Sequence, residues 1–278
     1  MVKIICDSGC DLTPEMAGKY DISLVPLNVH FGNETFRDGI DITADVFYEK
    51  LVADKVHPTT SAPGPGVFAE LYSRLAKQTD EIMVITISSK LSATYESAIQ
   101  AKELVGNTCR IEVIDSLWVC GGMLIPALHA ARSALQGMRL SELVKMVKDL
   151  LSRVNGYIIF DTLEYLRKGG RIGKAEALLG SLLKLNPVIT LKNGLVSPVA
   201  RTRSRASAID TLVELMEKVG SIEEMIVEHA TTPDELEVLA NRLSHIFPVE
   251  KMLRARISPV IGVHTGPRVL IAGGIAGK

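Results

Sequence analysis

The chain has 278 residues and a formal net charge of −1. A length above about 250 residues favours two domains over a single hydrophobic core. The balance of 31 Lys and Arg against 32 Asp and Glu residues gives no electrostatic attraction to nucleic acid or to an anionic membrane.

The sequence contains no segment with the roughly 18 uninterrupted apolar residues that a membrane-spanning helix needs. The N-terminal stretch meets charge at Lys3 and Asp7, before the apolar run of a signal peptide develops. We therefore expect a cytoplasmic protein without stable membrane insertion. The cysteines lack the paired spacing of a zinc site, so we expect reduced thiols and no bound metal at Cys6, Cys10, Cys109 and Cys120.

The first half alternates short apolar runs with helical patterns. The apolar runs predict buried strands at residues 2–6, 23–31, 82–87 and 111–114. Helical periodicity separates them at residues 65–76, 92–104 and 122–136. This alternation predicts an α/β/α domain over residues 1–154, with a parallel sheet covered by helices on both faces.

Polar residues follow the predicted strands of this sheet, at positions 7–8, 86–89 and 115–116. Ligands of parallel sheets bind beyond the carboxyl ends of the strands. Asp and Ser at such positions also serve simply as helix caps. Both interpretations remain open at each of the three places. The recurrence of polar residues after three strands of one sheet favours a ligand-binding rim.

The second half predicts a different sheet. Strand signals fall at residues 156–161, 187–191, 195–201, 225–229, 251–257 and 269–273. Asn193-Gly194 is a strong signal for a two-residue hairpin. Helical patterns lie at residues 175–185, 204–219 and 233–246. We expect residues 155–278 to form a second α/β domain, with a mixed or antiparallel sheet and helices on one face.

Four polar motifs are candidates for an anion site. Residues 59–64 (TTSAPG) and 88–95 (SSKLSATY) offer hydroxyls and helix-opening amides, although capping alone also explains them. Residues 166–173 (LRKGGRIG) combine paired glycines with cations, which fits an anion site or a solvated turn. His264 lies between glycines in residues 262–267, where it is either structural or part of a site.

Signatures of an autonomous catalyst are missing from the sequence. It contains no GxSxG elbow, no HExxH, no P-loop and no GxGxxG after a strand. Sequence alone does not test for a Ser-His-Asp triad, because the members of a triad are distant in the chain.

At these motifs the chain resembles the DegV family of bacterial fatty-acid-binding proteins. The similarity runs nearly end to end, through CDSxxDL at 6–12, FRDGIDIT at 36–43, TSxP at 60–63, SSxLSxTYxSA at 88–98, DS at 115–116, DTLxYLxxGGRI at 161–172 and GxHxGP at 262–267. The chain departs from the usual family residues, which are Gln, Ser, Gly and Gly, at Ala62, Gly64, Ala93 and Arg268.

The resemblance implies a two-domain α/β fold with one long-chain fatty acid between the domains and no cofactor. It implies that Thr60 and Ser92 hydrogen-bond the carboxylate, while Arg171 and His264 complete the polar network. Neighbouring positions in the same motifs are further pocket candidates, namely Ser61, Ala93, Thr94, Gly170 and Thr265.

Some family members resemble the acyl-carrying subunit of a bacterial fatty acid kinase. This implies a non-catalytic carrier that presents the carboxylate to a separate, ATP-dependent kinase protein for acyl-phosphate formation. Two alternatives remain open. One is an autonomous small-molecule phosphotransferase or acyl hydrolase, and the other is a lipid-responsive regulatory sensor.

An acyl tail requires aliphatic walls. Leu178 and Leu182, on the leucine-rich pattern, and Met123, on an earlier helix, are candidates, although each also fits an ordinary core. Arg201 and Arg203 alternate with Arg205 at strand spacing, so their charges are expected on one face. That face is either solvated or a docking surface for the kinase.

Overall fold

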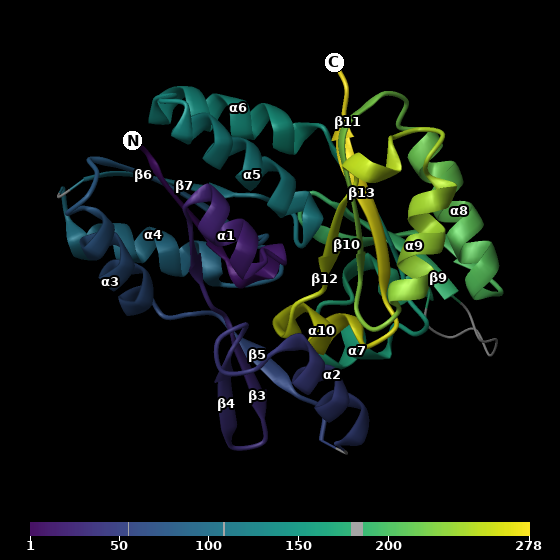
Figure 1. The fold of residues 1–278 in the computed structure, drawn as a ribbon. Coiled ribbons are helices and arrows are strands. Elements are labelled where there is room, and N and C mark those ends of the chain that lie inside the picture. Colours follow the sequence, from purple (N-terminus) through teal and green to yellow (C-terminus); the bar gives the residue numbers. More distant parts are fainter. Residues whose placement is uncertain (55, 108, 179–185) are drawn as a thin grey trace.

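The computed structural model describes residues 1–54, 56–107, 109–178 and 186–278. The first half contains a four-stranded parallel sheet with the strand order β2-β1-β6-β7 (Figure 1). Its strands are β1 (Lys3–Asp7), β2 (Ile22–Val25), β6 (Glu81–Thr86) and β7 (Arg110–Asp115). The predicted parallel sheet is confirmed.

Helices cover both faces of this sheet, because its strands bury side chains alternately on either side. Ile5 and Val84 pack toward α3 (Pro65–Leu75) and α4 (Thr94–Val105). Cys6 and Met83 belong to the core on the opposite face. The helices on that face are α1 (Pro14–Tyr20), α5 (Gly121–Leu135) and α6 (Leu140–Ser152).

The second half is built on a six-stranded mixed sheet with the order β10-β9-β8-β13-β11-β12. The strands are β8 (Val154–Ile159), β9 (Asn186–Lys192), β10 (Leu195–Thr202), β11 (Ile222–His229), β12 (Leu253–Arg256) and β13 (Leu270–Ala276). Only the β11–β12 pairing is parallel among these described strands. Asn193 and Gly194 both have positive φ, as the predicted hairpin turn requires.

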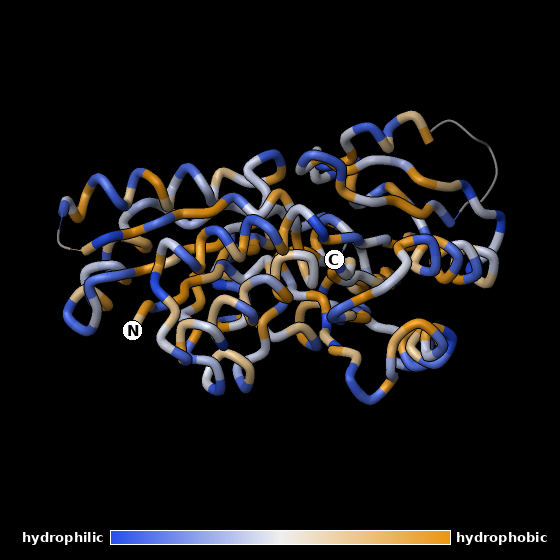
Figure 2. Tube along the Cα trace, turned by 90° about the horizontal axis from the view of Figure 1, so that it is seen from above, coloured by the Kyte–Doolittle hydropathy of each residue, from blue (hydrophilic) through white to orange (hydrophobic). Residues whose placement is uncertain are grey.

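Helices α8 (Arg205–Glu217) and α9 (Pro233–Arg242) cover one face of the mixed sheet, as predicted. The other face meets α5, which contacts strands of both large sheets. Ile158, Ile226 and Ile271 of the mixed sheet therefore share a core with Met123 and Leu128 of α5. Figure 2 shows hydrophobic segments running through the interior of both halves, with hydrophilic segments at the periphery.

The single strand predicted over residues 23–31 is wrong. Pro26 lacks the amide hydrogen that a central strand needs, and the chain leaves the parallel sheet after Val25. It continues in a separate three-stranded antiparallel sheet of β3 (Asn28–Phe31), β4 (Glu34–Arg37) and β5 (Thr59–Ser61). Helix α2 (Ala44–Ala53) lies between β4 and β5 in the chain. Residues 59–61 are therefore a strand and not a hydroxyl-rich helix opening.

The prediction of a leucine-rich α-helix over residues 175–185 is wrong for residues 175–178. Residues Gly173–Leu178 form a 3-10 helix, and residues 179–185, with Leu182, lie outside the described residues. The remaining short helices of the described chain are α7 (Glu164–Lys168), α10 (Pro259–Thr265) and the 3-10 turns Ser8–Cys10 and Val249–Lys251.

The second sheet begins with β8 at Val154. The proposed division between residues 154 and 155 remains a prediction. Among the described residues, the longest apolar helices fall short of the length needed to cross a membrane.

Substitution of Leu128 tests whether α5 packs in the core that the two halves share. It is fully buried, so Leu128→Ala removes methylenes from the core that the two halves share. We expect the free energy of unfolding to fall by about 2–5 kcal/mol in urea titrations. Leu104→Ala, at a helix position that is 67% exposed, is the matched control and should cost less than about 0.5 kcal/mol. Equal costs for the two variants would contradict this packing.

Candidate functional site

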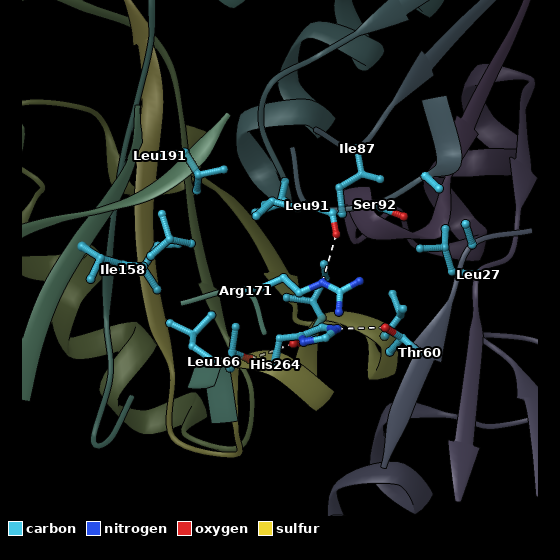
Figure 3. Close-up of a pocket in the computed structure, with 18 of the residues that line it drawn as sticks. Leu27, Thr60, Ile87, Leu91, Ser92, Ile158, Leu166, Arg171, Leu191 and His264 are labelled. Carbon is cyan, nitrogen blue, oxygen red and sulfur yellow. Dashed lines mark hydrogen bonds between the residues drawn. The ribbon is translucent and has the colours of Figure 1, made fainter. Parts of the chain in front are cut away.

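A cavity of about 160 Å³ lies between the two halves of the molecule. The first half contributes β5 and the loops after β2, β6 and β7, while the second half contributes β8, β9, β10, α7 and α10 (Figure 3). The expected ligand position between the halves thus coincides with a cavity.

The walls of this cavity are mainly aliphatic, and its polar groups are few. Thr60, Ser92, Arg171 and His264 all line it, as do Ser61 and Thr265. These residues come from a strand, a loop, a turn and a helix that are far apart in the sequence. The apolar lining consists of Leu27, Ala62, Ile87, Leu91, Ala93, Val119, Ile158, Phe160, Leu166, Ile189, Leu191, Val196, Val260 and Ile261.

Thr60 and His264 form a direct hydrogen bond, with 2.8 Å between Oγ1 and Nε2. The bond joins β5 of the small sheet to α10, so it connects the two halves at the cavity wall. Gly169 makes room for the imidazole, because a Cβ there would lie 2.1 Å from His264 Nδ1. Gly169, in the turn predicted from the sequence, therefore leaves the space in which the His264 ring packs.

His264 is neutral at physiological pH. Burial, together with the nearby Arg171 guanidinium and His57, lowers the pKa of His264 to about 3. The fixed positive charge at this end of the cavity consequently belongs to Arg171. His264 instead supplies a neutral ring that either donates to Thr60 or accepts from it.

Arg171 is held by two backbone carbonyls. Its Nε donates to Leu91 O at 3.1 Å (Figure 3), and its Nη1 donates to Gly169 O at 2.6 Å. Ser92 lies one residue after Leu91, and its Oγ is 2.8 Å from Oγ1 of the buried Thr94. A cation and a set of hydroxyls therefore converge at one end of an apolar cavity, an arrangement suited to a carboxylate.

Of the further pocket candidates, Ser61, Ala93 and Thr265 line the cavity. Thr94 and Gly170 are absent from its lining: Thr94 is buried behind Ser92, and Gly170 is an exposed turn residue with φ of 69°. Met123 and Leu178 are also absent from the lining. Met123 is fully buried in the core around α5, and Leu178 packs against that core.

Sequence analysis missed the strand residues that form the wall. Ile158 on β8, Ile189 and Leu191 on β9, and Val196 on β10 all face the cavity. Their apolar runs were recognised as strands, but a run of this kind carries no signal for which alternate residues face a cavity. The leucine-rich helical pattern with Leu178 and Leu182 is the more visible signal in the sequence, because it has more leucines than one buried helix face requires.

Arg201 and Arg203 are exposed, and Arg201 donates to Ala177 O at 2.7 Å. The expected alternation on one strand face is wrong, because β10 ends at Thr202 and α8 begins at Arg205. Arg205 turns inward instead and pairs with Asp161 and Glu235. Docking by Arg201 and Arg203 remains a prediction.

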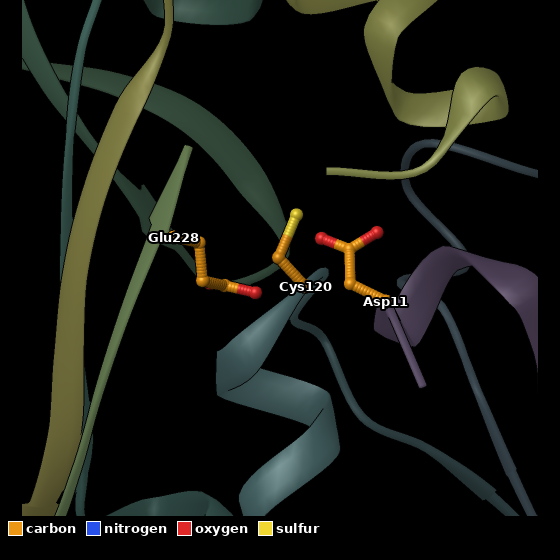
Figure 4. Close-up of side chains that lie close together, drawn as sticks. All are labelled: Asp11, Cys120 and Glu228. Carbon is orange, nitrogen blue, oxygen red and sulfur yellow. The ribbon is translucent and has the colours of Figure 1, made fainter. Parts of the chain in front are cut away.

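A second polar cluster joins the two halves near the first turn of α5. Carboxylate oxygens of Asp11 and Glu228 and the thiol of Cys120 all lie within 4.8 Å of one another (Figure 4). Ser258 N–H donates to Asp11, and Gly121 N–H donates to Glu228, each at 2.9 Å. Both bonds connect segments from opposite halves of the chain.

Burial raises the pKa of Glu228 well above its ordinary value and that of Asp11 to about 6. In the described part of the chain, these two residues with Cys120 are the one group whose donors could hold a metal ion. The expectation that no metal is bound remains a prediction. No local pattern of residues predicts this cluster, because its members are distant in the chain.

The fold and cavity define an α/β protein with two large sheets, a small antiparallel sheet and a largely apolar site between its halves. The profile of the DegV family, described as a family of uncharacterised proteins, matches residues 1–274. The chain therefore belongs to the DegV family, as the sequence motifs indicated.

Solved structures agree with this assignment. DegV from Bacillus subtilis, a fatty acid binding protein, is 31% identical, with a TM-score of 0.90 and 99% of both chains covered. A fatty-acid-binding DegV family protein from Thermus thermophilus is 29% identical, with a TM-score of 0.91 and 99% of both chains covered. The Streptococcus pneumoniae Fatty Acid Kinase (Fak) B3 protein, loaded with linoleic acid, is 21% identical and shares the fold, with a TM-score of 0.88 and 100% of both chains covered.

The protonation state of His264 is directly measurable. Because its pKa is about 3, we expect its ring resonances to stay constant from pH 8 down to pH 5 in NMR spectra of labelled histidine. The His264→Gln variant identifies these resonances by their loss. Protonation of His264 near pH 6 would contradict the buried, cation-flanked environment.

Proposed function

We propose that this protein binds one long-chain fatty acid in the cavity between its halves and presents the carboxylate to a separate kinase. The observation that carries this proposal is the asymmetry of the cavity. One end gathers Thr60, Ser92, Arg171 and His264, while the rest of the lining is almost entirely aliphatic. Such a cavity matches an amphiphile that has one anionic head and a long apolar tail.

The energetics favour this ligand class. A sixteen-carbon acid buries about fourteen methylenes, which gives a gross driving force of about 11 kcal/mol at roughly 0.8 kcal/mol each. Association costs reduce the net affinity. A carboxylate buried without partners would cost several kcal/mol, and Arg171 with the hydroxyl donors offsets this cost.

His264 has a positioning role in this proposal. With its proton on Nε2, the ring donates to Thr60 Oγ1 and leaves the threonine hydrogen free to point at the carboxylate. The low pKa of His264 keeps the ring in its neutral form, in which one nitrogen can also accept. The carboxylate then receives its hydrogen bonds from hydroxyls and its charge compensation from Arg171.

The relatives support the same ligand class. The Bacillus and Thermus DegV structures are described as fatty-acid-binding proteins, and the Streptococcus protein is described as part of a fatty acid kinase. A carrier role also agrees with the absence of nucleophile and nucleotide motifs in the sequence. We place the activity in the cytoplasm, where a kinase has access to ATP.

Native mass spectrometry of the purified protein tests the ligand. We expect one co-purified fatty acid per chain, with no other cofactor. Thr60→Val removes one hydrogen bond to a charged group, so palmitate affinity should fall about 10- to 100-fold in calorimetric titrations. Thr59→Val, at the exposed neighbour on β5, is the matched control and should bind like the unaltered protein. Failure of the unaltered protein to bind palmitate or oleate would overturn the proposal.

The partner is tested by acyl-phosphate formation. Loaded protein, ATP and the ATP-binding subunit of a bacterial fatty acid kinase should together give acyl phosphate, trapped with hydroxylamine and detected by mass spectrometry. An Arg201→Glu, Arg203→Glu variant should slow this reaction about tenfold without weakening palmitate binding, because exposed charges chiefly steer association.

Each alternative function gives a different result. Product formed by this chain and ATP alone would identify an autonomous enzyme. Fatty acid binding without phosphorylation by any added kinase would favour a lipid-responsive sensor.

A further inference from the structure

A small second cavity adjoins the site. Its volume is about 20 Å³, and it shares Val119, Ile158 and Leu191 with the larger cavity. These three shared residues form the boundary between the two hollows, on the wall contributed mainly by the mixed sheet. The small cavity therefore lies directly behind an aliphatic part of the wall of the larger cavity.

The small cavity exists because glycines line it. Gly122 on α5, Gly156 on β8 and Gly273 on β13 contribute no side chains to its walls. The indole of Trp118 lies against two of them. A Cβ on Gly122 would lie 2.8 Å from the Trp118 ring, and a Cβ on Gly156 would lie 3.3 Å from it. The Trp118 indole thus occupies the space that Gly122 and Gly156 leave free.

Trp118 also faces the outside of the molecule. A surface groove of about 520 Å³ shares Trp118 and Leu191 with the small cavity. Trp118 is partly exposed, and the remainder of the groove is lined by residues of β7, α4, α6 and the β9–β10 turn. The indole is therefore part of the partition between an interior cavity and the solvent-facing groove.

The direction of a bound acid follows from the polar groups. The cation and hydroxyls that suit a carboxylate lie at Arg171, Thr60 and Ser92, none of which lines the small cavity. The residues that line the small cavity include no cation that could neutralise an anionic head. An acid with its head at Arg171 can direct only its methyl end toward Trp118.

We propose that Trp118 closes the distal end of the acyl tunnel and thereby sets the longest chain that this protein encloses. The proposal rests on the proposed function, since it names the specificity determinant of the same site. Chains that reach the indole fill the tunnel, and longer chains must fold back or leave carbons outside. Removal of the indole joins the small cavity to the surface groove and extends the tunnel.

Fluorescence tests the proposal on the unaltered protein, because Trp118 is the only tryptophan in the chain. Bromine quenches an indole that it contacts. Hexadecanoic acid brominated at its omega carbon should therefore quench the emission strongly, and the acid brominated at its alpha carbon should quench it weakly. Equal quenching, or no quenching by a bound omega-bromo acid, would overturn the assignment of Trp118.

Substitution tests the effect on chain length. Each additional buried methylene multiplies affinity about fourfold. If the space vacated by the indole takes two of the four additional methylenes, Trp118→Ala should favour a twenty-carbon over a sixteen-carbon saturated acid about 16-fold more than the unaltered protein does. Tyr95→Ala is the matched control, because Tyr95 lines the surface groove but neither cavity. Its chain-length preference should remain unchanged.

A double variant provides the reverse test. Within 4 Å of a Cβ on Gly156, the described neighbours are atoms of the Trp118 ring alone. Trp118→Ala combined with Gly156→Leu should therefore refill the vacated space and restore the original chain-length limit.

The two proposals fail in different ways. If the unaltered protein binds no fatty acid, the proposed function fails. If it binds palmitate but Trp118→Ala keeps the original chain-length preference, only the role of Trp118 fails. Should Trp118→Ala not fold, as judged by circular dichroism, the quenching experiment on the unaltered protein decides the question.

Discussion

The packing of α5 against both large sheets is the contact on which the rest of the structure depends. One helix closes a face of the parallel sheet and the inner face of the mixed sheet, so the two halves share a single core. The cavity, the small cavity and the Asp11–Glu228 cluster all lie near the start of this helix or the loop that precedes it. Because packed interiors tolerate little displacement, α5 fixes the distance between the walls of the site.

The polar end of the cavity depends on a second constraint, which is that buried polar groups need partners. Thr60 and His264 satisfy one another across the two halves, and Arg171 is held by the carbonyls of Leu91 and Gly169. The small antiparallel sheet acquires its importance here, since β5 brings Thr60 to α10. An arrangement satisfied in this way is ready for a carboxylate before any ligand enters.

The apolar part of the site follows different rules. Its walls are alternate residues of β8, β9 and β10, whose opposite faces pack under α8 and α9. Glycines extend the space beyond Ile158 and Leu191, and the aromatic side chain of Trp118 limits it. Under the proposed function, the affinity for a tail comes from this aliphatic area, and the proposed limit on its length is where the space ends.

The sequence by itself determined the parallel and mixed sheets and the four polar residues of the site. Strand periodicity, the Asn193-Gly194 turn and the family motifs around Thr60, Ser92, Arg171 and His264 are local patterns, so they are readable without the fold. Only the tertiary structure decided the rest. Which face of β9 meets the cavity depends on pairing with distant strands, and Asp11 meets Glu228 only because the halves close on α5. Met123 and Leu178, the wall candidates that the structure describes, do not line the cavity, because long-range packing leaves no local periodicity to recognise.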